Sequence, residues 1–444
     1  MEGLKKKFYL IVASYFAFWA RLVLHSWQPE VILVTGSSGK TTVFRLLEAQ
    51  LGSKAEYAYH SNSAFGIPFN ILGLERHTYS LAEWLKFFVL APFRFGVAKN
   101  RAKLYVVEAD AERPGEADFI HRLLQPKTVI VTNIFQTHSA YFDELVTKGQ
   151  YFYAIEAVAA EFVKYLRGAT KRAIINADNQ LLFETVEKTD LPKEVRDCMV
   201  YLQAADYLRE YKIYSDHTQF VINGQTFNFP YFLPQEVAMG IEITRLVCEE
   251  FGIRMRRDFD NYQLEPGRSS LFAGIRETTL IDSTYNANLG SALAMLKSFR
   301  DYPADKKWLV LGEFRELGRE AELQHTQLAQ FILDQMTMVE QVVLVSPEMR
   351  EWVYPLLSAR WGSARVQCFD EAAQAYAWIY NHLQGGETLL IKASQGRHLE
   401  AIVEGLLADP ADAAKLSCRQ AIYRPIQERI LQAVKTNGQE SHEG

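Results

Sequence analysis

The stretch Val31-Ile-Leu-Val-Thr-Gly-Ser-Ser-Gly-Lys-Thr-Thr42 decides the fold of this chain. Its first five residues form a short apolar run, which is typical of a strand buried on both faces of a parallel sheet. Two glycines follow, and a helical pattern begins at Lys40. A buried strand, a glycine-bearing turn and a helix N-terminus together make a phosphate-binding loop, because backbone N–H groups and the helix dipole attract anions.

This loop predicts that the chain binds a nucleoside triphosphate, namely ATP. We expect Lys40 to contact the β- and γ-phosphates and the Thr41 hydroxyl to reach Mg²⁺. The residues predicted to bind the nucleotide here are Gly36, Ser37, Ser38, Gly39, Lys40, Thr41 and Thr42. The usual spacing puts the first glycine at position 34, which is Val34 in this chain, so the loop is a shortened form of the motif. An ordinary strand-to-helix turn is the alternative interpretation.

Apolar strand candidates alternate with helical patterns along most of the chain. This alternation predicts an α/β fold with a P-loop central domain of mainly parallel sheet and a Rossmann-like C-terminal domain. The strand candidates are Val31–Thr35, Leu104–Glu108, Thr128–Asn133, Ala173–Asn176, Thr279–Asp282, Trp308–Gly312, Gln341–Ser346 and Thr388–Lys392. The clearest helical patterns are Ala154–Leu166, Leu289–Phe299 and Ala321–Gln335.

Two local signals refine this organisation. Asn223-Gly224, between two short apolar runs, predicts a β-hairpin turn. The cluster Glu265-Pro-Gly-Arg268 predicts a hinge, after which the strand–helix alternation starts again. We therefore expect three regions: a hydrophobic N-terminal helix over 1–28, a central domain over 29–270 and a C-terminal domain over 271–444.

The composition excludes several classes of protein. The chain has 444 residues, with 48 Lys and Arg against 53 Asp and Glu, and 48% of it is hydrophobic. A globally basic nucleic-acid-binding protein and a disordered chain are both excluded on these grounds. The four cysteines, at 198, 248, 368 and 418, contain no CxxC pair, which argues against a zinc cluster or a disulfide framework. Free thiols fit a cytoplasmic protein.

The N-terminus raises the question of membrane contact. Lys5, Lys6 and Lys7 precede an almost uncharged run from Phe8 to Ala20, which Arg21 interrupts. This run is shorter than the roughly 20 residues that a membrane-spanning helix needs, and no signal-peptide cleavage site follows it. Two interpretations stay open. In the first, an aromatic-rich helix packs on the body of the protein or on another subunit. In the second, residues 5–27 lie in the membrane interface, at the inner face of the membrane.

Polar side chains follow two further predicted strands. Glu108 ends one strand, and His138 comes five residues after Asn133, which ends the next. Because parallel strands place their carboxyl ends at one edge of a sheet, both side chains are expected near the phosphate loop. Oxygen and nitrogen ligands beside a triphosphate suit a bound Mg²⁺. The sequence thus predicts a metal site formed by Thr41, Glu108 and His138.

Taken together, the motifs resemble those of the Mur ligases, the ATP-dependent ligases that build the peptide stem of peptidoglycan. The most specific segment, Ile281–Asn288, is close to the DDSYNANP sequence of the type that adds D-alanyl-D-alanine. The other similar segments are Thr35–Thr42 (TGTNGKTT in the family), His60–Pro68, Glu108 with Gly115-Glu116, Thr132–Ile134 with His138, Asn176–Asn179, Pro266–Arg268, Leu311–Gly318 with His325, and Lys392–Ser394. Their order is kept over four-fifths of the chain.

The resemblance implies a three-step acyl transfer with ATP and Mg²⁺ as cofactors. A carboxylate takes the γ-phosphoryl group, an amine attacks the acyl phosphate, and phosphate leaves. The implied partners are a small-molecule acid and an amino acid or dipeptide, with no nucleic acid. By resemblance the catalytic residues are Lys40, His138 and Arg268, and the further nucleotide contacts are Asp282, Asn286 and Asn288. The implied substrate contacts are Asn62, Glu313, Glu316, Lys392 and Ser394.

Several positions depart from the family pattern. Only about 30 residues precede the phosphate strand, where family members usually carry a domain that grips the UDP-sugar, so we expect that domain to be missing. Phe162 stands where the family has a carbamylated lysine for a second Mg²⁺, and Asp110 replaces a glycine. Three alternatives follow: a Mur-like ligase with a different acid substrate, a catalytically degraded nucleotide-binding scaffold of a cell-wall complex, and a P-loop kinase or ATPase.

Overall fold

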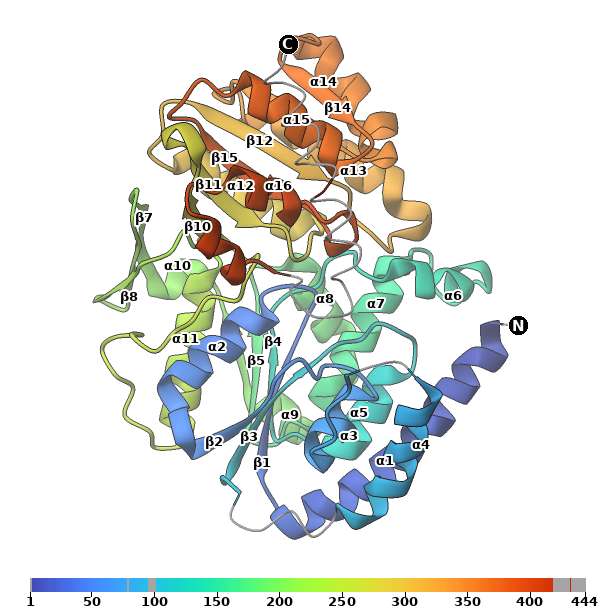
Figure 1. Cartoon of the computed structure of the whole chain (residues 1–444). Coiled ribbons are helices and arrows are strands. Elements are labelled where there is room, and N and C mark those ends of the chain that lie inside the picture. Colours follow the sequence, from blue (N-terminus) through green and yellow to red (C-terminus); the bar gives the residue numbers. More distant parts are fainter. Residues whose placement is uncertain (1, 78–79, 95–100, 418–431, 433–444) are drawn as a thin grey trace. The chain divides into compact units, whose positions relative to one another are not determined.

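The computed structural model describes residues 2–77, 80–94, 101–417 and 432, with the side chains described from Tyr9 onward (Figure 1). The chain forms two compact units. The first contains the residues up to Tyr207 together with Val237–Tyr262, and the second contains Leu208–Glu236 together with the residues from Gln263 onward. The domain boundaries predicted at 28 and 270 stay a prediction.

The first unit is built on a six-stranded parallel sheet in the order β2-β3-β1-β4-β5-β6. The strands are β1 (Glu30–Thr35), β2 (Ala55–Ala58), β3 (Leu104–Ala109), β4 (Thr128–Val131), β5 (Arg172–Asn176) and β6 (Met199–Leu202). Every residue of β1 from Val31 to Thr35 is buried, as its apolar sequence predicts. Since β1 lies between β3 and β4, the loops that follow these three strands lie at the same edge.

Helices cover both faces of this sheet (Figure 1). Helices α2 (Lys40–Leu51) and α11 (Val237–Glu250) lie against one face. The other face is covered mainly by α5 (Glu116–Leu124), α7 (Ala154–Val163) and α8 (Gln180–Lys188). The remaining helices of the unit are α1 (Glu2–Trp27), α3 (Gly66–Leu72), α4 (Leu81–Leu90), α6 (Asp143–Thr147), α9 (Lys193–Asp197) and α10 (Ala204–Tyr207).

Helix α1 packs against the first unit along one side. Phe16, Ala17, Ala20 and Val23 are buried in the same core as strands β1 and β3. By length and composition the part from Tyr9 to Trp27 is also apolar enough to cross a membrane, a test that core helices and signal sequences pass as well. The structure therefore shows a packed helix, and membrane contact through residues 5–27 stays a prediction.

The second unit contains two sheets. Strands β7 (Leu208–Ile213), β8 (Thr218–Ile222) and β9 (Gln225–Phe229) form a three-stranded antiparallel sheet. The predicted hairpin turn is confirmed: Asn223 and Gly224 join β8 to β9, with φ angles of 50° and 79°. Positive φ at both central residues is the requirement of a type I′ turn, which Asn-Gly meets better than other dipeptides.

A six-stranded mixed sheet forms the body of this unit, in the order β10-β11-β15-β12-β13-β14. Only the β10–β11 pair is antiparallel. Its strands are β10 (Ser270–Ala273), β11 (Thr279–Ser283), β12 (Lys307–Gly312), β13 (Gln341–Val345), β14 (Val366–Phe369) and β15 (Thr388–Lys392). Its α-helices are α12 (Leu289–Asp301), α13 (Ala321–Gln335), α14 (Tyr354–Trp361), α15 (Ala372–His382) and α16 (Glu400–Leu406). The predicted α/β fold class is confirmed.

Four strands of the two six-stranded sheets were not predicted from the sequence, namely β2, β6, β10 and β14, and β7 of the antiparallel sheet was not predicted either. The first four each have four residues, and each is an edge strand of its six-stranded sheet. The predicted strand Thr128–Asn133 ends earlier, at Val131, because Thr132 and Asn133 bind the phosphate loop instead of continuing the ladder. Among the cysteines, Cys198, Cys248 and Cys368 are free thiols, while Cys418 lies outside the described residues.

Candidate active site

The phosphate loop connects β1 to α2 and needs its first glycine. Gly36 has φ 128°, and a Cβ atom there would lie 2.2 Å from Thr132 Oγ1 and 2.8 Å from the Asn133 carbonyl oxygen. A side chain therefore cannot be placed at this position without moving Thr132 and Asn133, which follow β4. Gly39 also has positive φ, 80°, and stands directly before the first residue of α2. Glycine adopts this conformation without the steric cost that other residues meet.

Thr132 and Asn133 hold the loop in shape. The Ser37 N–H donates to the Asn133 carbonyl at 2.9 Å, and the Ser38 N–H donates to Asn133 Oδ1 at 2.9 Å. The Thr132 hydroxyl donates to the Ser38 carbonyl at 2.6 Å. The next residues form the first turn of α2. The first N–H groups of any helix have no acceptor within the helix itself. These amides are the natural donors to a bound phosphate.

Lys40 lies in this loop with two partners. Its Nζ donates to the Gly36 carbonyl at 2.5 Å and forms an ion pair with Asp110 Oδ2 at 3.0 Å. Burial by itself would raise the pKa of Asp110, but the charges of Lys40 and His138 and the hydrogen bonds that the carboxylate accepts outweigh it and lower this pKa. Asp110 therefore stays ionised and keeps the cationic end of Lys40 at the loop.

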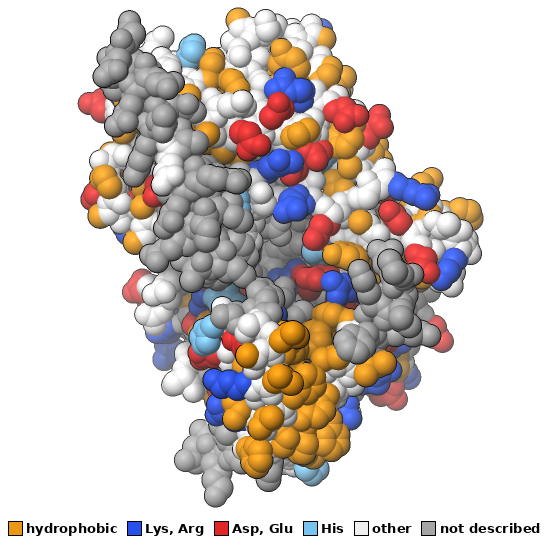
Figure 2. All heavy atoms as spheres, turned by 45° about the vertical axis from the view of Figure 1, so that its right-hand side comes forward, with side chains coloured by type: hydrophobic (Ala, Val, Ile, Leu, Met, Phe, Trp, Pro, Cys, Tyr) orange, Lys and Arg blue, Asp and Glu red, His pale blue; other side chains and the backbone are white. Residues whose placement is uncertain are grey.

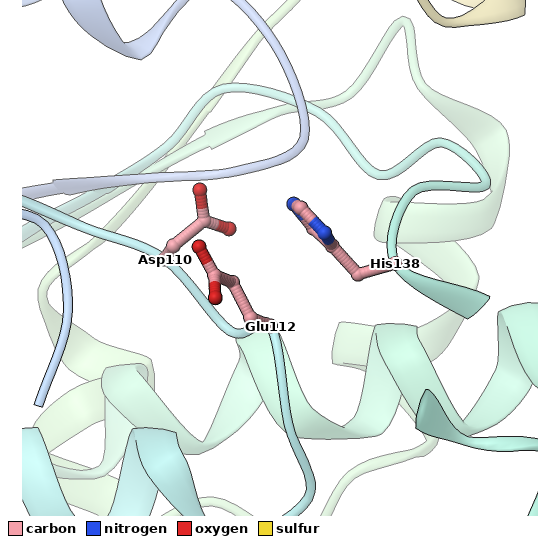
Figure 3. A group of neighbouring side chains, drawn as sticks. All are labelled: Asp110, Glu112 and His138. Carbon is pink, nitrogen blue, oxygen red and sulfur yellow. The ribbon is translucent and has the colours of Figure 1, made fainter. Parts of the chain in front are cut away.

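Three side chains beside Lys40 form a group that suits a metal ion (Figure 3). Asp110, Glu112 and His138 each offer one ligand atom, and these atoms all lie within 4.8 Å of one another. Asp110 and Glu112 follow β3, and His138 comes from the loop after β4. Two carboxylates and one imidazole provide the oxygen and nitrogen donors that divalent cations bind. The residues present therefore fit a divalent ion such as Mg²⁺.

The metal site predicted from the sequence (Thr41, Glu108 and His138) shares only His138 with this group. His138 belongs to the group, whereas Glu108 accepts a hydrogen bond from the Thr41 hydroxyl at 3.2 Å. Asp110 and Glu112 were missed as ligand candidates. The alternation of carboxylates at positions 108, 110 and 112, at the end of a buried strand, was the signal that could have indicated them. The metal roles of Thr41 and Glu108 stay a prediction.

Asn62, a predicted substrate contact, lies at this same edge. Its carbonyl accepts the Asp110 N–H at 2.9 Å, which ties the segment 60–68 to the loop after β3. Glu116, the first residue of α5, makes a second hydrogen bond to this segment, in which its Oε1 accepts the Ala64 N–H at 3.0 Å. Burial raises the pKa of Glu116 to about 7. Glu116 Oε2 is buried and has no hydrogen-bond partner among the residues that the structure describes.

Helix α1 reaches this region through Tyr9. The Tyr9 hydroxyl donates to Glu116 Oε1 at 3.5 Å. The Arg113 guanidinium lies over the Tyr9 ring, 4.5 Å from its centroid, and 5.1 Å from the centroid of Tyr141. A cation held between two aromatic rings has a fixed position, since both ring faces attract it. Arg113 and Tyr9 were not predicted as site residues.

Phe162 was predicted to stand where the family has a lysine that binds a second Mg²⁺. Its ring is 1% exposed and packs in the hydrophobic core of the first unit. The neighbouring Glu161 accepts the N–H groups of Gly115 and Ala117 at 2.8 and 3.0 Å, and Lys164 donates to the same carboxylate at 2.7 Å. The match of Phe162 to the family's lysine stays a prediction, and the charged residues beside this ring hold the start of α5.

In the second unit, several predicted residues meet at the carboxyl ends of β11 and β15. Lys392 is buried, and its Nζ donates to Ser283 Oγ at 3.3 Å and to the Asn286 carbonyl at 3.1 Å. Burial, together with the nearby charge of Arg268, lowers the pKa of Lys392 to about 7. Asp282 is fully buried and accepts the Thr284 hydroxyl at 2.7 Å. This edge brings a lysine that readily loses its proton close to a buried carboxylate.

Three further predicted residues lie at the same edge of this sheet. Asn288 caps α12, because its side chain accepts the Ser291 N–H at 2.8 Å. The Ser394 hydroxyl donates to the Ala287 carbonyl at 3.3 Å. The Arg268 guanidinium lies 4.7 Å from the centroid of the Tyr285 ring. The turn before it requires glycine at position 267, where φ is 70° and a Cβ atom would meet the Tyr285 backbone N at 3.0 Å.

Glu313 and Glu316, also predicted to bind substrate, are placed differently. Glu313 is buried and accepts the Arg397 Nε at 2.5 Å, and Arg397 also donates to Glu348 at 3.3 Å. Burial raises the pKa of Glu313, although the hydrogen bond and charge of Arg397 oppose this. Glu316 is exposed, with φ 60°. Arg397 was missed because its link to Glu313 spans 84 residues of sequence.

The fold and the loop after β1 define a P-loop nucleotide-binding protein of the α/β class with a second α/β unit. Two family models match the chain: the Mur ligase middle domain over residues 34–234, and the Mur ligase, glutamate ligase domain over residues 267–395. The chain belongs to the Mur ligase family, as its motifs predicted.

Curated relatives extend over most of the chain. A UDP-N-acetylmuramoyl-tripeptide–D-alanyl-D-alanine ligase of Rickettsia prowazekii is 24% identical over 390 residues, covering 85% of this chain and 78% of the relative. The enzyme of the same name from Bacillus subtilis is 23% identical over 419 residues, covering 88% and 79%. Both relatives carry the name of the ligase type that Ile281–Asn288 indicated.

Solved structures of MurF ligases share the fold. The MurF ligase of Thermotoga maritima in complex with ADP superposes with a TM-score of 0.67 at 20% identity, covering 88% of this chain and 82% of that one. A MurF structure from Acinetobacter baumannii gives a TM-score of 0.69 at 18% identity, covering 90% and 79%. At these identities the likeness concerns the fold alone.

Proposed function

We propose that this chain is an ATP- and Mg²⁺-dependent ligase that joins a carboxylic acid to an amine through an acyl phosphate. Within that class we propose the reaction named for its curated relatives, the addition of D-alanyl-D-alanine to UDP-N-acetylmuramoyl-tripeptide during peptidoglycan synthesis. The observation that carries the proposal is the phosphate loop with Lys40 next to the Asp110, Glu112 and His138 group. Phosphoryl transfer needs a lysine and a metal site at one place.

In this reaction the substrate carboxylate attacks the γ-phosphorus of ATP, which gives the acyl phosphate and ADP. The incoming amine then attacks the acyl carbon, and the tetrahedral intermediate expels phosphate. Lys40 would stabilise the negative charge on the transferring phosphoryl group, and the α2 amides would bind the phosphate oxygens. Asp110, Glu112 and His138, with Thr41 and Glu108 beside them, would hold Mg²⁺, which when bound neutralises phosphate charge.

The other roles follow the predicted residues. Asn62, beside Asp110, and Glu116, which holds the same segment, would position the acid. In the second unit, Arg268, Asp282, Asn286 and Asn288 would contact the nucleotide. Lys392, Ser394, Glu313 and Glu316 would contact the amine substrate. The pKa of Lys392, about 7, lets it exchange a proton with an amine near neutral pH.

A second candidate keeps the reaction and changes the acid. It is favoured by the contact of Tyr9 with Glu116 and Arg113, because helix α1 then contributes to the region proposed to bind the acid. A membrane-bound acid would fit a cytoplasmic enzyme that works at the inner face of the membrane, with residues 5–27 in contact with lipid. We include this location in the proposal.

An amine-dependent assay tests the proposal. Phosphate release from ATP is measured with a panel of acids and amines, including UDP-N-acetylmuramoyl-tripeptide and D-alanyl-D-alanine, and the products are identified by mass spectrometry. Lys40→Ala is expected to lower the rate by about 10²- to 10³-fold, the usual cost of losing a group that stabilises transition-state charge. Lys54→Ala, at an exposed lysine beyond the end of α2, is the matched control and should keep the rate.

The outcomes distinguish the candidates. A ligated product from the UDP-sugar acid supports the named reaction, and a product from another acid supports the second candidate. Phosphate release without any amine indicates a simple ATPase. Full activity in Lys40→Ala contradicts the proposed mechanism. Nucleotide binding without turnover for every pair supports a degraded scaffold instead.

A further inference from the structure

Helices α1 and α4 of the first unit pack side by side (Figure 1). The Tyr15 hydroxyl of α1 donates to the Phe88 carbonyl of α4 at 2.7 Å. The Phe16 ring of α1 lies 6.1 Å from the Trp84 ring and 5.0 Å from the Phe88 ring, measured between centroids. Aromatic pairs at such distances attract each other beyond the apolar area that they bury. The two helices therefore form one continuous piece of surface.

Large apolar side chains cover the outside of this pair. On α4, Leu81, Leu85 and Val89 are spaced by four residues and are 83%, 66% and 64% exposed. The complete set adds Phe93 after α4 and three residues of α1, and we call it the α1–α4 face: Ile11, Phe18, Leu22, Leu81, Leu85, Val89 and Phe93. These are seven of the fifteen exposed large hydrophobic side chains among the described residues. A broad hydrophobic area is visible on the surface in Figure 2.

An exposed apolar area of this kind indicates a binding surface. Single exposed apolar side chains are common, but contiguous apolar patches mark interaction sites with proteins or membranes. A spacing of four residues places Leu81, Leu85 and Val89 on one side of α4, and the buried Phe87 lies on the other. An amphipathic helix with its apolar side outward is the form that binds at a bilayer interface.

The charge near the α1–α4 face favours an anionic lipid surface over a second copy of the chain as the binding partner. Among the described side chains of 9–27 and 80–94, three are basic (Arg21, Lys86 and Arg94) and one is acidic (Glu83), although the whole chain has an acidic excess. Arg21 is exposed next to Leu22, and Lys86 is exposed next to Leu85. Basic residues beside apolar ones favour a surface of anionic lipid. A second copy of the chain would instead bring like charges together, which opposes pairing.

The buried side of α1 limits the orientations that the helix can take at a membrane. Phe16, Ala20 and Val23 are fully buried in the core of the first unit. To cross a bilayer, α1 would have to leave that core and expose Phe16 together with the surface of its partners. A helix that stays packed can only lie parallel to the membrane surface, with its outer side among the lipid headgroups.

We propose that the α1–α4 face docks this chain on an anionic lipid bilayer, with both helices in the interface and neither crossing it. The inference deepens the membrane location of the proposed function and rests on it. It adds α4, which the sequence had not indicated, and it names the lipid charge.

Flotation with vesicles tests this. The full chain is mixed with vesicles of phosphatidylcholine alone or with 30% phosphatidylglycerol (a chosen composition), and the bound fraction is measured. We expect binding to the anionic vesicles that weakens with salt. Leu85→Asp with Val89→Asp should weaken this binding at least tenfold, and so should Phe18→Asp with Leu22→Asp. Leu356→Asp, on the helix α14 of the second unit, is the matched control and should bind like the unchanged chain.

Several results would overturn the proposal. These are equal binding to both vesicle types, no binding to either, or full binding by the α4 double variant. Resistance of the bound chain to alkaline carbonate extraction would indicate a spanning helix. A dimer in lipid-free solution that the α4 double variant abolishes would mean that the face is an interface between copies. Ligase activity on water-soluble substrates, measured without vesicles, should be unchanged in the α4 variant, which shows that the variant is folded. Absence of ligase activity in the unchanged chain would contradict the proposed function and would leave the docking result as it stands.

Discussion

The carboxyl edges of the two six-stranded sheets each present a lysine, and the two lysines are held in different ways. Lys40 of the first unit has the carboxylate of Asp110 at 3.0 Å. Lys392 of the second unit is buried and donates to the neutral oxygens of Ser283 and Asn286. Burial and the charge of Arg268 lower the pKa of Lys392 to about 7. The same residue type is thus prepared to bind phosphate at one edge and to exchange a proton at the other.

The largest expected effect concerns the acidic group at the first edge. His138→Ala removes one of the three ligands offered by Asp110, Glu112 and His138. We expect the apparent affinity for Mg²⁺, measured by titrating the ligase rate, to fall about 10- to 100-fold, a range seen when residues that support a metal are lost. His77→Ala, at an exposed histidine, is the control. An unchanged Mg²⁺ titration in His138→Ala would contradict the assignment of the metal to this edge.

The second edge is tested by the stability of Lys392→Met. Below pH 7 this lysine is charged in the folded and the unfolded chain alike. Between about pH 7 and its ordinary pKa of 10.5, the unfolded chain binds more protons, so stability rises with pH. Removing the amine should flatten this rise, whose upper limit is about 1.4 kcal/mol for each pH unit between the two pKa values. Melting temperatures from pH 6 to pH 10 measure the slope, with Lys297→Met at an exposed lysine as control.

Asp110→Asn tests whether the ion pair with Asp110 weakens the binding of phosphate by Lys40. The variant removes the ion pair but keeps a side chain of the same shape. Without its partner, Lys40 is more attractive to phosphate, so we expect ADP to bind about fivefold more tightly in the presence of EDTA, which corresponds to about 1 kcal/mol. Calorimetry measures this. Asp118→Asn, which breaks the ion pairs of α5 with Lys164 and Arg167, serves as control. Weaker ADP binding would show that Asp110 orients Lys40 instead of restraining it.

The smallest effect is expected for Glu116→Gln. Burial raises the pKa of this carboxyl from 4.5 to about 7, so between those pH values the folded chain binds more protons and stability falls as pH rises. This slope is opposite to that of Lys392. The variant should gain about 0.5–1 kcal/mol at pH 8 relative to pH 4.5. Thermal melts at both pH values, with the exposed Glu194→Gln as control, decide it. A gain that is equal at both values would not come from the titration of Glu116.

The contrast between central and edge strands explains what the sequence could predict of the fold. Strands such as β1 and β12 are buried along their length and read as continuous apolar runs, so their bounds were predicted within one residue. The missed strands β2 and β14 have only four residues and include half-buried polar positions. An edge strand has a neighbour on one side only, and its residues need not be apolar. Nothing in four such residues separates a strand from a loop.

The site follows the same rule. The residues of the phosphate loop were predicted because the strand, glycines and lysine are contiguous in the sequence. The group around His138 was predicted only in part, because a sequence shows which strands end at an edge but not which of several carboxylates faces the metal. Arg397 and Glu313 were not predicted as a pair, since a contact between residues 84 positions apart depends on the packing of the whole unit.

The membership of β7–β9 in the second unit has a consequence for any attempt to divide the protein. The chain passes from one unit to the other after Tyr207, after Glu236 and after Tyr262, so no single cut separates them. A fragment ending at Tyr262 would contain Ile213 and Phe232 without the core in which they are buried. Such a fragment is expected to aggregate, whereas removal of Leu208–Glu236 with a short linker gives the first unit a continuous chain of its own.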